Sequence, residues 1–468
     1  MGKEEKMGVQ GTEKSEFGFK DKLGYMFGDF GNDFTFILSS MFLMKFYTDV
    51  MGVSGALVGV MMMLARFVDA FTDVTMGQLV DRSRSTAKGK FAPWIKRMCG
   101  PVAVASFLMY ASWFKDMPMW FKIFWMFFTY ILWGSVFYTS INIPYGSMAS
   151  AISAEPKDRA KLSNARSVGA ALAGTAIGVI LPLVVYYTDE NGNQALSGTK
   201  MSVAAFLCSV GAVICYLLCY HMTTERVQME RKTGRFSFRE FINTLFRNRA
   251  LIGIVVSALF LLLATLSLST MMSYVYPNYF GNLGAQSLST LLGTIVTLIS
   301  ATFIVRLSTN IGKKELAIIG SLISVVSFVV LFWIQTKNVW VFTAFYVVAY
   351  LGQAFFSLIC WAMITDVIDD TEVKTGERSD GTIYSIYSFA RKCGQALASG
   401  LAGLLLTIIG YSEATQFEPD VVQGIYNITC LAPALGFGLV IISLWFLYPL
   451  NKKTVENNAA ELAKRRKS

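Results

Sequence analysis

The sequence predicts an all-α integral membrane protein with twelve transmembrane helices arranged as two six-helix halves. Its composition, its repeated apolar stretches and the alternating charge of the segments between them all predict this fold class. Of 468 residues, 54% are hydrophobic and only 15% are charged, whereas a soluble domain carries about 25% charged residues. A soluble core could not bury so much apolar surface, so the lipid bilayer is the solvent of most of this chain.

Apolar stretches long enough to cross a bilayer recur along the chain. A hydrocarbon core of about 30 Å needs about 20 apolar residues per helix. Backbone groups in lipid must pair within their own segment, and uninterrupted apolar runs exclude the alternating pattern of a membrane barrel. The predicted spans are residues 23–48, 54–80, 94–114, 119–150, 165–187, 200–222, 250–276, 286–307, 315–335, 338–364, 382–410 and 424–448.

Lysine and arginine gather in the polar segments on one side of the predicted membrane. The connections on the other side, residues 188–199 and 411–423, are poor in basic residues and contain several acidic ones. The positive-inside rule therefore predicts that both termini are cytoplasmic. We expect the chain to lie in the cytoplasmic (inner) membrane of the cell. The net charge of +10 then reflects orientation and contact with membrane lipid rather than nucleic-acid binding.

The basic middle segment divides the chain into two similar halves. The loops after the second and fourth spans resemble the loops after the eighth and tenth. Two such halves predict a major-facilitator fold, with the substrate site between them near the middle of the membrane. The predicted parts are a cytoplasmic N-terminal segment 1–22, a first half 23–222, a cytoplasmic loop 223–249, a second half 250–448 and a basic tail 449–468.

Cysteine and histidine usage argues against an enzyme. The seven cysteines lie within or at the edges of apolar spans, without the paired spacing of a zinc or redox motif. His221 is the single histidine, so a histidine metal cluster or a Ser-His-Asp hydrolase is hard to build. We expect no cofactor besides a coupling ion. The N-terminal segment also lacks the pattern of a cleaved signal peptide.

The second predicted span holds three charged residues. Arg66, Asp69 and Asp73 are three and four positions apart, so they share one helical face. A charge in the middle of a span costs about 2.5–3.5 kcal/mol, so this face must line the protein interior or a water-filled cavity. Two carboxylates one turn apart repel each other and favour binding of a proton or a hard cation such as Na⁺. Alternatively, Arg66 neutralises one carboxylate and the group only holds helices together.

Polar residues also interrupt the first and fourth spans. Asp29 and Asp33 stand in a glycine-rich part of the first span, where Asp33 could accept hydrogen bonds from sugar hydroxyls, or where both could face a water-filled vestibule. In the fourth span, Pro144 frees a backbone carbonyl and can open the helix toward a ligand. Thr139 and Asn142 are three positions apart and share a face.

The eleventh span contains the adjacent cations Arg391 and Lys392. Adjacent helical residues point about 100° apart, so at least one of these side chains faces inward. Either could pair with a carboxylate of the first or second span, which would join the two halves. The alternative is that both extend to the membrane edge.

These residues lie in stretches that resemble the glycoside-pentoside-hexuronide:cation symporter family, which includes melibiose permease. The resemblance covers nearly the whole chain, and its most specific stretches together far exceed any single motif. They are residues 46–52 (FYTDVMG), 65–73 (ARFVDAFTD), 89–94 (GKFAPW), 142–145 (NIPY) and 366–378 (DVIDDTEVKTGER).

The resemblance implies a cation site on the second and fourth spans. Asp69 and Asp73 would be the cation ligands, and would bind the metal if the coupling ion is Na⁺. Thr139 and Asn142 would assist them. Because Asn142 stands where melibiose permease has an aspartate, the site has one charge fewer, and coupling to Na⁺ and to H⁺ both stay open.

The resemblance also implies a sugar site. Asp33 and Arg166 would hold sugar hydroxyls, with Asn142 and Tyr138 nearby, and Lys392 would couple cation and sugar. Gly146 replaces a tryptophan that stacks on the sugar in melibiose permease, so an α-galactoside is not implied. Aromatic residues of this chain could supply a stacking surface instead. They are Tyr138, Trp361 and Tyr387.

The sequence thus predicts a symporter that couples uptake of a glycoside, pentoside or hexuronide to Na⁺ or H⁺ by alternating access, with a monomer as the functional unit. Arg66, Lys392, Asp366 and Arg378 would be its coupling and structural charges. The loops 81–90 and 366–378 would act as cytoplasmic latches of the outward-open form. The alternative within the same fold is a cation-coupled carrier of lysolipids or other small molecules.

Overall fold

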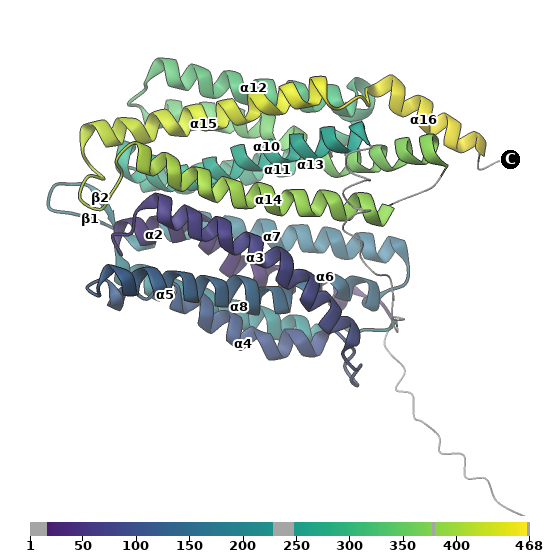
Figure 1. The fold of residues 1–468 in the computed structure, drawn as a ribbon, viewed down its shortest axis with the longest axis horizontal. Coiled ribbons are helices and arrows are strands. Elements are labelled where there is room, and N and C mark those ends of the chain that lie inside the picture. Colours follow the sequence, from purple (N-terminus) through teal and green to yellow (C-terminus); the bar gives the residue numbers. More distant parts are fainter. Residues whose placement is uncertain (1–15, 228–247, 377–379, 466–468) are drawn as a thin grey trace, which may run out of the picture.

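Two bundles of long, roughly parallel helices lie side by side in the computed structural model, which describes residues 16–227, 248–376 and 380–465 (Figure 1). The purple-to-blue helices of the first bundle occupy the lower part of the view, and the green-to-yellow helices of the second bundle occupy the upper part. Long helices form here because each apolar segment satisfies its own backbone groups.

The first bundle contains six helical rods, some of them built from several segments. The first rod passes through a π-helical turn, and so does the fourth. The rods are α1 (Phe19–Leu38) with η1 (Ser39–Leu43) and α2 (Met44–Asp49); α3 (Gly55–Arg82); α4 (Ala92–Leu108); α5 (Met119–Ile131) with η3 (Leu132–Tyr138) and α6 (Thr139–Ile152); α7 (Pro156–Val185); and α8 (Gly198–Met222).

The second bundle repeats this plan and ends in an extra helix. Its rods are α10 (Arg249–Tyr274) with η4 (Val275–Phe280), α11 (Leu283–Ile311), α12 (Lys313–Ile334), α13 (Val339–Thr375), α14 (Asp380–Ile408) and α15 (Pro419–Phe446), and the chain continues into α16 (Lys452–Arg465).

Each of the twelve predicted spans overlaps one of these rods. Nine stretches within the described residues are long and apolar enough to cross a membrane. The first rod, α4 and α14 are not among them. The helix α4 has only 17 residues, and α14 carries Arg391 and Lys392. The polar residues of α14 line the cavity described below, which accounts for its lower hydrophobicity.

Several predicted boundaries were wrong. The tenth span was predicted to end at residue 364, but α13 runs on to Thr375 and ends at Gly376, whose φ of 76° forms the helix cap. Asp366 therefore lies in a helix and not in a loop. The fifth rod starts at Pro156 instead of residue 165, because proline at the first helical position is already preorganised.

One short hairpin departs from the all-helical prediction. Strands β1 (Tyr186–Thr188) and β2 (Gln194–Leu196) pair antiparallel between α7 and α8. Gly192, with a φ of 83°, allows the tight turn between them. We call this side of the molecule the hairpin end, and the opposite side, where α16 lies, the terminal end (Figure 1).

The two bundles approach each other most closely where α3 meets α14. A Cβ atom added at Gly403 would overlap the backbone oxygen of Gly55, and one added at Gly59 would lie 2.9 Å from the oxygen of Ser399. Glycine is required at these positions because any side chain would push the helices apart. This contact lies toward the hairpin end.

We expect Gly403→Ala to destabilise the protein by about 1–3 kcal/mol, the usual cost of overpacking. The measurement is thermal unfolding in detergent. Gly438→Ala is the matched control, since a Cβ there meets nothing within 4 Å and alanine favours a helix by up to about 1 kcal/mol. Equal stability of the two variants would contradict a close contact between α3 and α14.

Candidate functional site

A cavity of about 960 Å³ lies between the two bundles. Its lining comes from the terminal-end halves of α7, α13 and α14 and from the middle of α1, α3 and the fourth rod. The residues are Asp29, Asp33, Phe36, Arg66, Asp69, Asp73, Tyr138, Thr139, Asn142, Ser163, Arg166, Ser167, Ala170, Trp361, Thr365, Ser388, Arg391, Lys392 and Gln395. Every predicted cation and substrate residue is therefore placed at one cavity.

Asp69 is held by groups from its own helix and from the fourth rod. Ser135 Oγ donates to Asp69 Oδ1 at 2.5 Å, and Arg66 Nη1 lies 3.3 Å from Asp69 Oδ2. The π-helical segment η3 carries Ser135. Sequence reasoning missed this serine, although it lies one helical turn before Thr139 and so shares its face.

Asp73 has one partner from each bundle. Thr139 Oγ1 donates to Asp73 Oδ1 at 3.0 Å, and Lys392 Nζ of α14 forms an ion pair with Asp73 Oδ2. Each of the two carboxylates therefore has a cationic partner, Arg66 for Asp69 and Lys392 for Asp73. The predicted ion pair between the halves is present, and its members are Lys392 and Asp73.

Asn142 and Tyr138 also line the cavity. Asn142 Oδ1 accepts a long hydrogen bond of 3.5 Å from Asn32 Nδ2, and Asn32 in turn accepts from the Tyr216 hydroxyl at 2.9 Å. Tyr138 stacks on Phe36, with 6.0 Å between ring centroids. Asn142 is thus linked to α1 through Asn32 and from there to α8 through Tyr216. In contrast, Ser135 and Thr139 contact the aspartates of α3.

The two aspartates of α1 have different surroundings. Asp29 Oδ1 accepts from Arg166 Nε at 2.9 Å, and the Arg166 guanidinium lies 5.5 Å from the centre of the Tyr145 ring. Among the residues that the structure describes, Asp33 has no hydrogen bond or ion pair, and it faces the cavity. Asp33 is therefore the carboxylate available to a ligand.

The second bundle contributes an aromatic and cationic wall. The Arg391 guanidinium lies 5.5 Å from the centre of the Trp361 ring and 5.9 Å from that of Tyr387. These two rings meet edge to face, with 4.9 Å between their centroids. Arg391 and Lys392 both line the cavity, so neither extends to the membrane edge.

The charges predicted as latches lie elsewhere. Asp366 Oδ1 accepts from Lys313 Nζ at 2.6 Å, so this pair joins α13 to α12 within the second bundle. Nearby, Asp370 accepts from Lys374 at 2.6 Å and from Asn458 of α16 at 3.1 Å. Arg378 lies outside the described residues. In this conformation the described pairs brace the second bundle and do not join it to the first.

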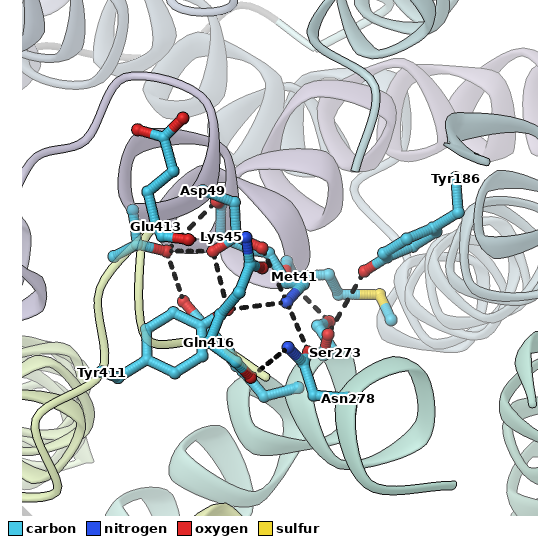
Figure 2. Close-up of polar contacts among 11 residues, drawn as sticks. Met41, Lys45, Asp49, Tyr186, Ser273, Asn278, Tyr411, Glu413 and Gln416 are labelled. Carbon is cyan, nitrogen blue, oxygen red and sulfur yellow. Dashed lines mark hydrogen bonds and ion pairs between the residues drawn. The ribbon is translucent and has the colours of Figure 1, made fainter. Parts of the chain in front are cut away.

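A second buried charge cluster closes the hairpin end (Figure 2). Lys45 Nζ lies 2.8 Å from Asp49 Oδ2, and the two side chains are only 1% and 2% exposed. Lys45 also donates to Asn278 Oδ1 at 2.8 Å and to the Tyr411 hydroxyl at 3.0 Å. The Tyr411 hydroxyl donates to Asp49 Oδ1 at 2.8 Å. An ion pair of the first bundle is thus completed by two residues of the second.

Other bonds between the bundles surround this cluster. The Tyr186 hydroxyl donates to the Ser273 carbonyl at 3.2 Å, and Ser273 Oγ donates to the Met41 carbonyl at 3.0 Å (Figure 2). Thr48 and Tyr274 share a hydrogen bond of 3.2 Å. The hairpin end is therefore closed by direct contact between the bundles.

Two helical bundles with a charged cavity between them, joined tightly at one end, define a multi-pass membrane transporter. A family model described as MFS/sugar transport protein matches residues 24–452, and the chain belongs to this family. Because the family consists of transporters, the chain is not an enzyme.

Curated relatives and solved structures agree with this family. The chain is 30% identical to a glucuronide carrier protein homolog of Escherichia coli over 95% of each chain. It is 30% identical to an isoprimeverose transporter of Lactiplantibacillus pentosus, over 93% of this chain and 89% of that one. The crystal structure of a D-xylose-proton symporter aligns with a TM-score of 0.66 at 13% identity, covering 93% of this chain and 99% of the other. The predicted fold class and family are confirmed.

Proposed function

We propose that this protein is a symporter that couples uptake of a sugar to Na⁺ or H⁺. The observation that carries the proposal is the arrangement at Asp69 and Asp73, where two carboxylates meet the hydroxyls of Ser135 and Thr139 beside a cavity large enough for a sugar. Carboxylate and hydroxyl oxygens suit a hard cation. The names of relatives, a glucuronide carrier homolog and an isoprimeverose transporter, support a sugar as the cargo.

The coupling follows from competition at Asp73. Lys392 contacts this carboxylate, so a cation that binds Asp73 displaces the lysine. The displaced ammonium then lies at the cavity, where it can donate to a sugar. Binding of cation and sugar favours the transport step only when each improves the affinity for the other.

The orientation of the chain sets the direction of access. We place the terminal end in the cytoplasm of a cell whose inner membrane the chain spans, because the basic segments lie there. The closed hairpin end then faces outside, and the conformation described above is inward-open. We also propose a monomer as the functional unit, since both walls of the cavity come from one chain.

The lining of the cavity favours a sugar over a lysolipid. Eight of its side chains are charged, and a further group carries hydroxyls or amides. A sugar can satisfy many such groups, whereas an acyl chain would leave them buried without partners. Competition between sugars and lysolipids for binding distinguishes the two cargoes.

We expect Asp69→Asn to abolish cation-dependent uptake, because the variant loses a charged cation ligand. The measurement is uptake of a labelled sugar panel by proteoliposomes under an imposed Na⁺ or pH gradient. Asp116→Asn, an exposed aspartate near the hairpin end, is the matched control and should behave as the unchanged protein. Cation stimulation that survives in Asp69→Asn would overturn the assignment of this site.

A further inference from the structure

We propose that the transported sugar carries one negative charge and that Arg391 binds its anionic group. This inference rests on the proposed function and adds the charge and the orientation of the substrate. Its starting point is the pairing of charges in the cavity.

Four acidic and four basic residues line the cavity. Three pairs account for six of them: Asp29 with Arg166, Asp69 with Arg66, and Asp73 with Lys392. The two that remain are Asp33, on α1, and Arg391, on α14. Within the described residues, and before a coupling cation binds, the first bundle therefore offers the cavity an unpaired acceptor and the second offers an unpaired cation.

Arg391 is held in a way that suits anion binding. Within the described part of the chain it forms no ion pair, and its contacts are with the rings of Trp361 and Tyr387 and with the Tyr387 hydroxyl. When a guanidinium stacks on an aromatic ring, its flat face contacts the ring. The N–H groups at its edge can then donate hydrogen bonds to other partners. These donors form a planar fork that matches a carboxylate with two parallel hydrogen bonds.

The charge balance of the loaded cavity also favours an anion. With all eight groups ionised, the lining charges sum to zero, so a bound monovalent cation leaves a net charge of +1 between the bundles. A charge is costly in a poorly solvated interior. A substrate with one negative charge restores neutrality, and cation and anion then strengthen each other's binding.

The same pairing orients the substrate. The anionic group is repelled by Asp33 and attracted by Arg391 and by Lys392, which the cation has displaced from Asp73, so it lies against α14. The hydroxyls at the other side of the sugar ring then face Asp33, whose carboxylate accepts hydrogen bonds from them. Such a substrate contacts both bundles at once, as closure around it requires.

The test compares sugars that differ only in charge. Methyl glucoside and methyl glucuronide, and the corresponding galactose pair, are offered to proteoliposomes and to purified protein in binding measurements. We expect the charged member to bind at least about tenfold more tightly. We expect Arg391→Gln to weaken its binding by about 10- to 100-fold, the usual worth of a hydrogen bond to a charged group, while binding of the uncharged member changes little. Arg97→Gln, an exposed arginine of α4, is the control.

A second readout is independent of affinity. One cation carried with one anionic sugar moves no net charge, so uptake of the glucuronide should not respond to an imposed K⁺ diffusion potential.

Cation-dependent uptake of glucosides with equal or higher affinity would overturn the inference and leave the proposed symport intact. The absence of binding for every sugar would overturn both. An equal loss for both members of a pair in Arg391→Gln would show that the residue acts structurally, which also overturns the inference.

Discussion

Lys45→Met is expected to open the hairpin end and to lower uptake by about 100-fold or more. Lys45 and Asp49 are almost completely buried, and removal of one partner of a buried ion pair costs about 3–5 kcal/mol because the other charge stays behind. That cost corresponds to a factor of at least about 100 in an equilibrium constant.

The cost falls mainly on the closed conformation. Lys45 meets Asn278 and Tyr411 of the second bundle, and these contacts exist only while the hairpin end is closed. When the bundles separate there, water reaches Asp49 and compensates its charge. The variant should therefore accumulate in the conformation that is open at the hairpin end.

Distances between spin labels measure this shift. Cysteines introduced at the exposed positions Asn191 and Ala414 place one label on each side of the closed end. We expect a longer distance in Lys45→Met than in the parent. The double variant Lys45→Met with Asp49→Asn removes both charges and should recover part of the short distance. An unchanged distance in Lys45→Met would show that this ion pair does not hold the end closed.

The helical framework could be predicted from the sequence because the apolar composition of each span reflects the lipid that surrounds it. An apolar run of sufficient length is a helix in lipid whatever its neighbours are. The ends of the rods were harder. The helix α13 continues eleven residues past the predicted end at residue 364, to Thr375, because helix termini depend on caps and breakers rather than on apolar composition. Gly376 supplies the cap.

The candidate site was predicted in part. Arg66, Asp69 and Asp73 could be assigned to one face because helical geometry fixes their relation. The contact between Lys392 and Asp73 was one of several possible pairs, since spacing within a helix does not reveal which helix lies opposite. Lys45 and Asp49 have the same four-residue spacing at the end of the first rod, but the residues that complete their ion pair are 233 and 366 positions away from Lys45. Only the packing of the two bundles brings those residues together.

Replacement of Lys392 should separate cation binding from net transport. In Lys392→Gln, nothing competes with the cation for Asp73, so we expect cation affinity to rise by at least about tenfold, given the strength of charge-assisted hydrogen bonds. The carrier without cargo must then change conformation with Asp73 lacking its counter-ion. An uncompensated buried charge costs about 3–5 kcal/mol, which slows this return step by about 100-fold or more.

Exchange of internal for external sugar needs no such return step, because the carrier is loaded in both directions. We therefore expect Lys392→Gln to lose net cation-driven uptake and to keep exchange in proteoliposomes loaded with sugar and cation on both sides. Lys374→Gln is the control, since Lys374 is exposed and pairs with Asp370 away from the cavity.

Loss of exchange together with net uptake would assign Lys392 to the transport step itself. Unchanged cation affinity would show that lysine and cation do not compete for Asp73, and the coupling would then have to arise at Asp69, whose partners Arg66 and Ser135 belong entirely to the first bundle.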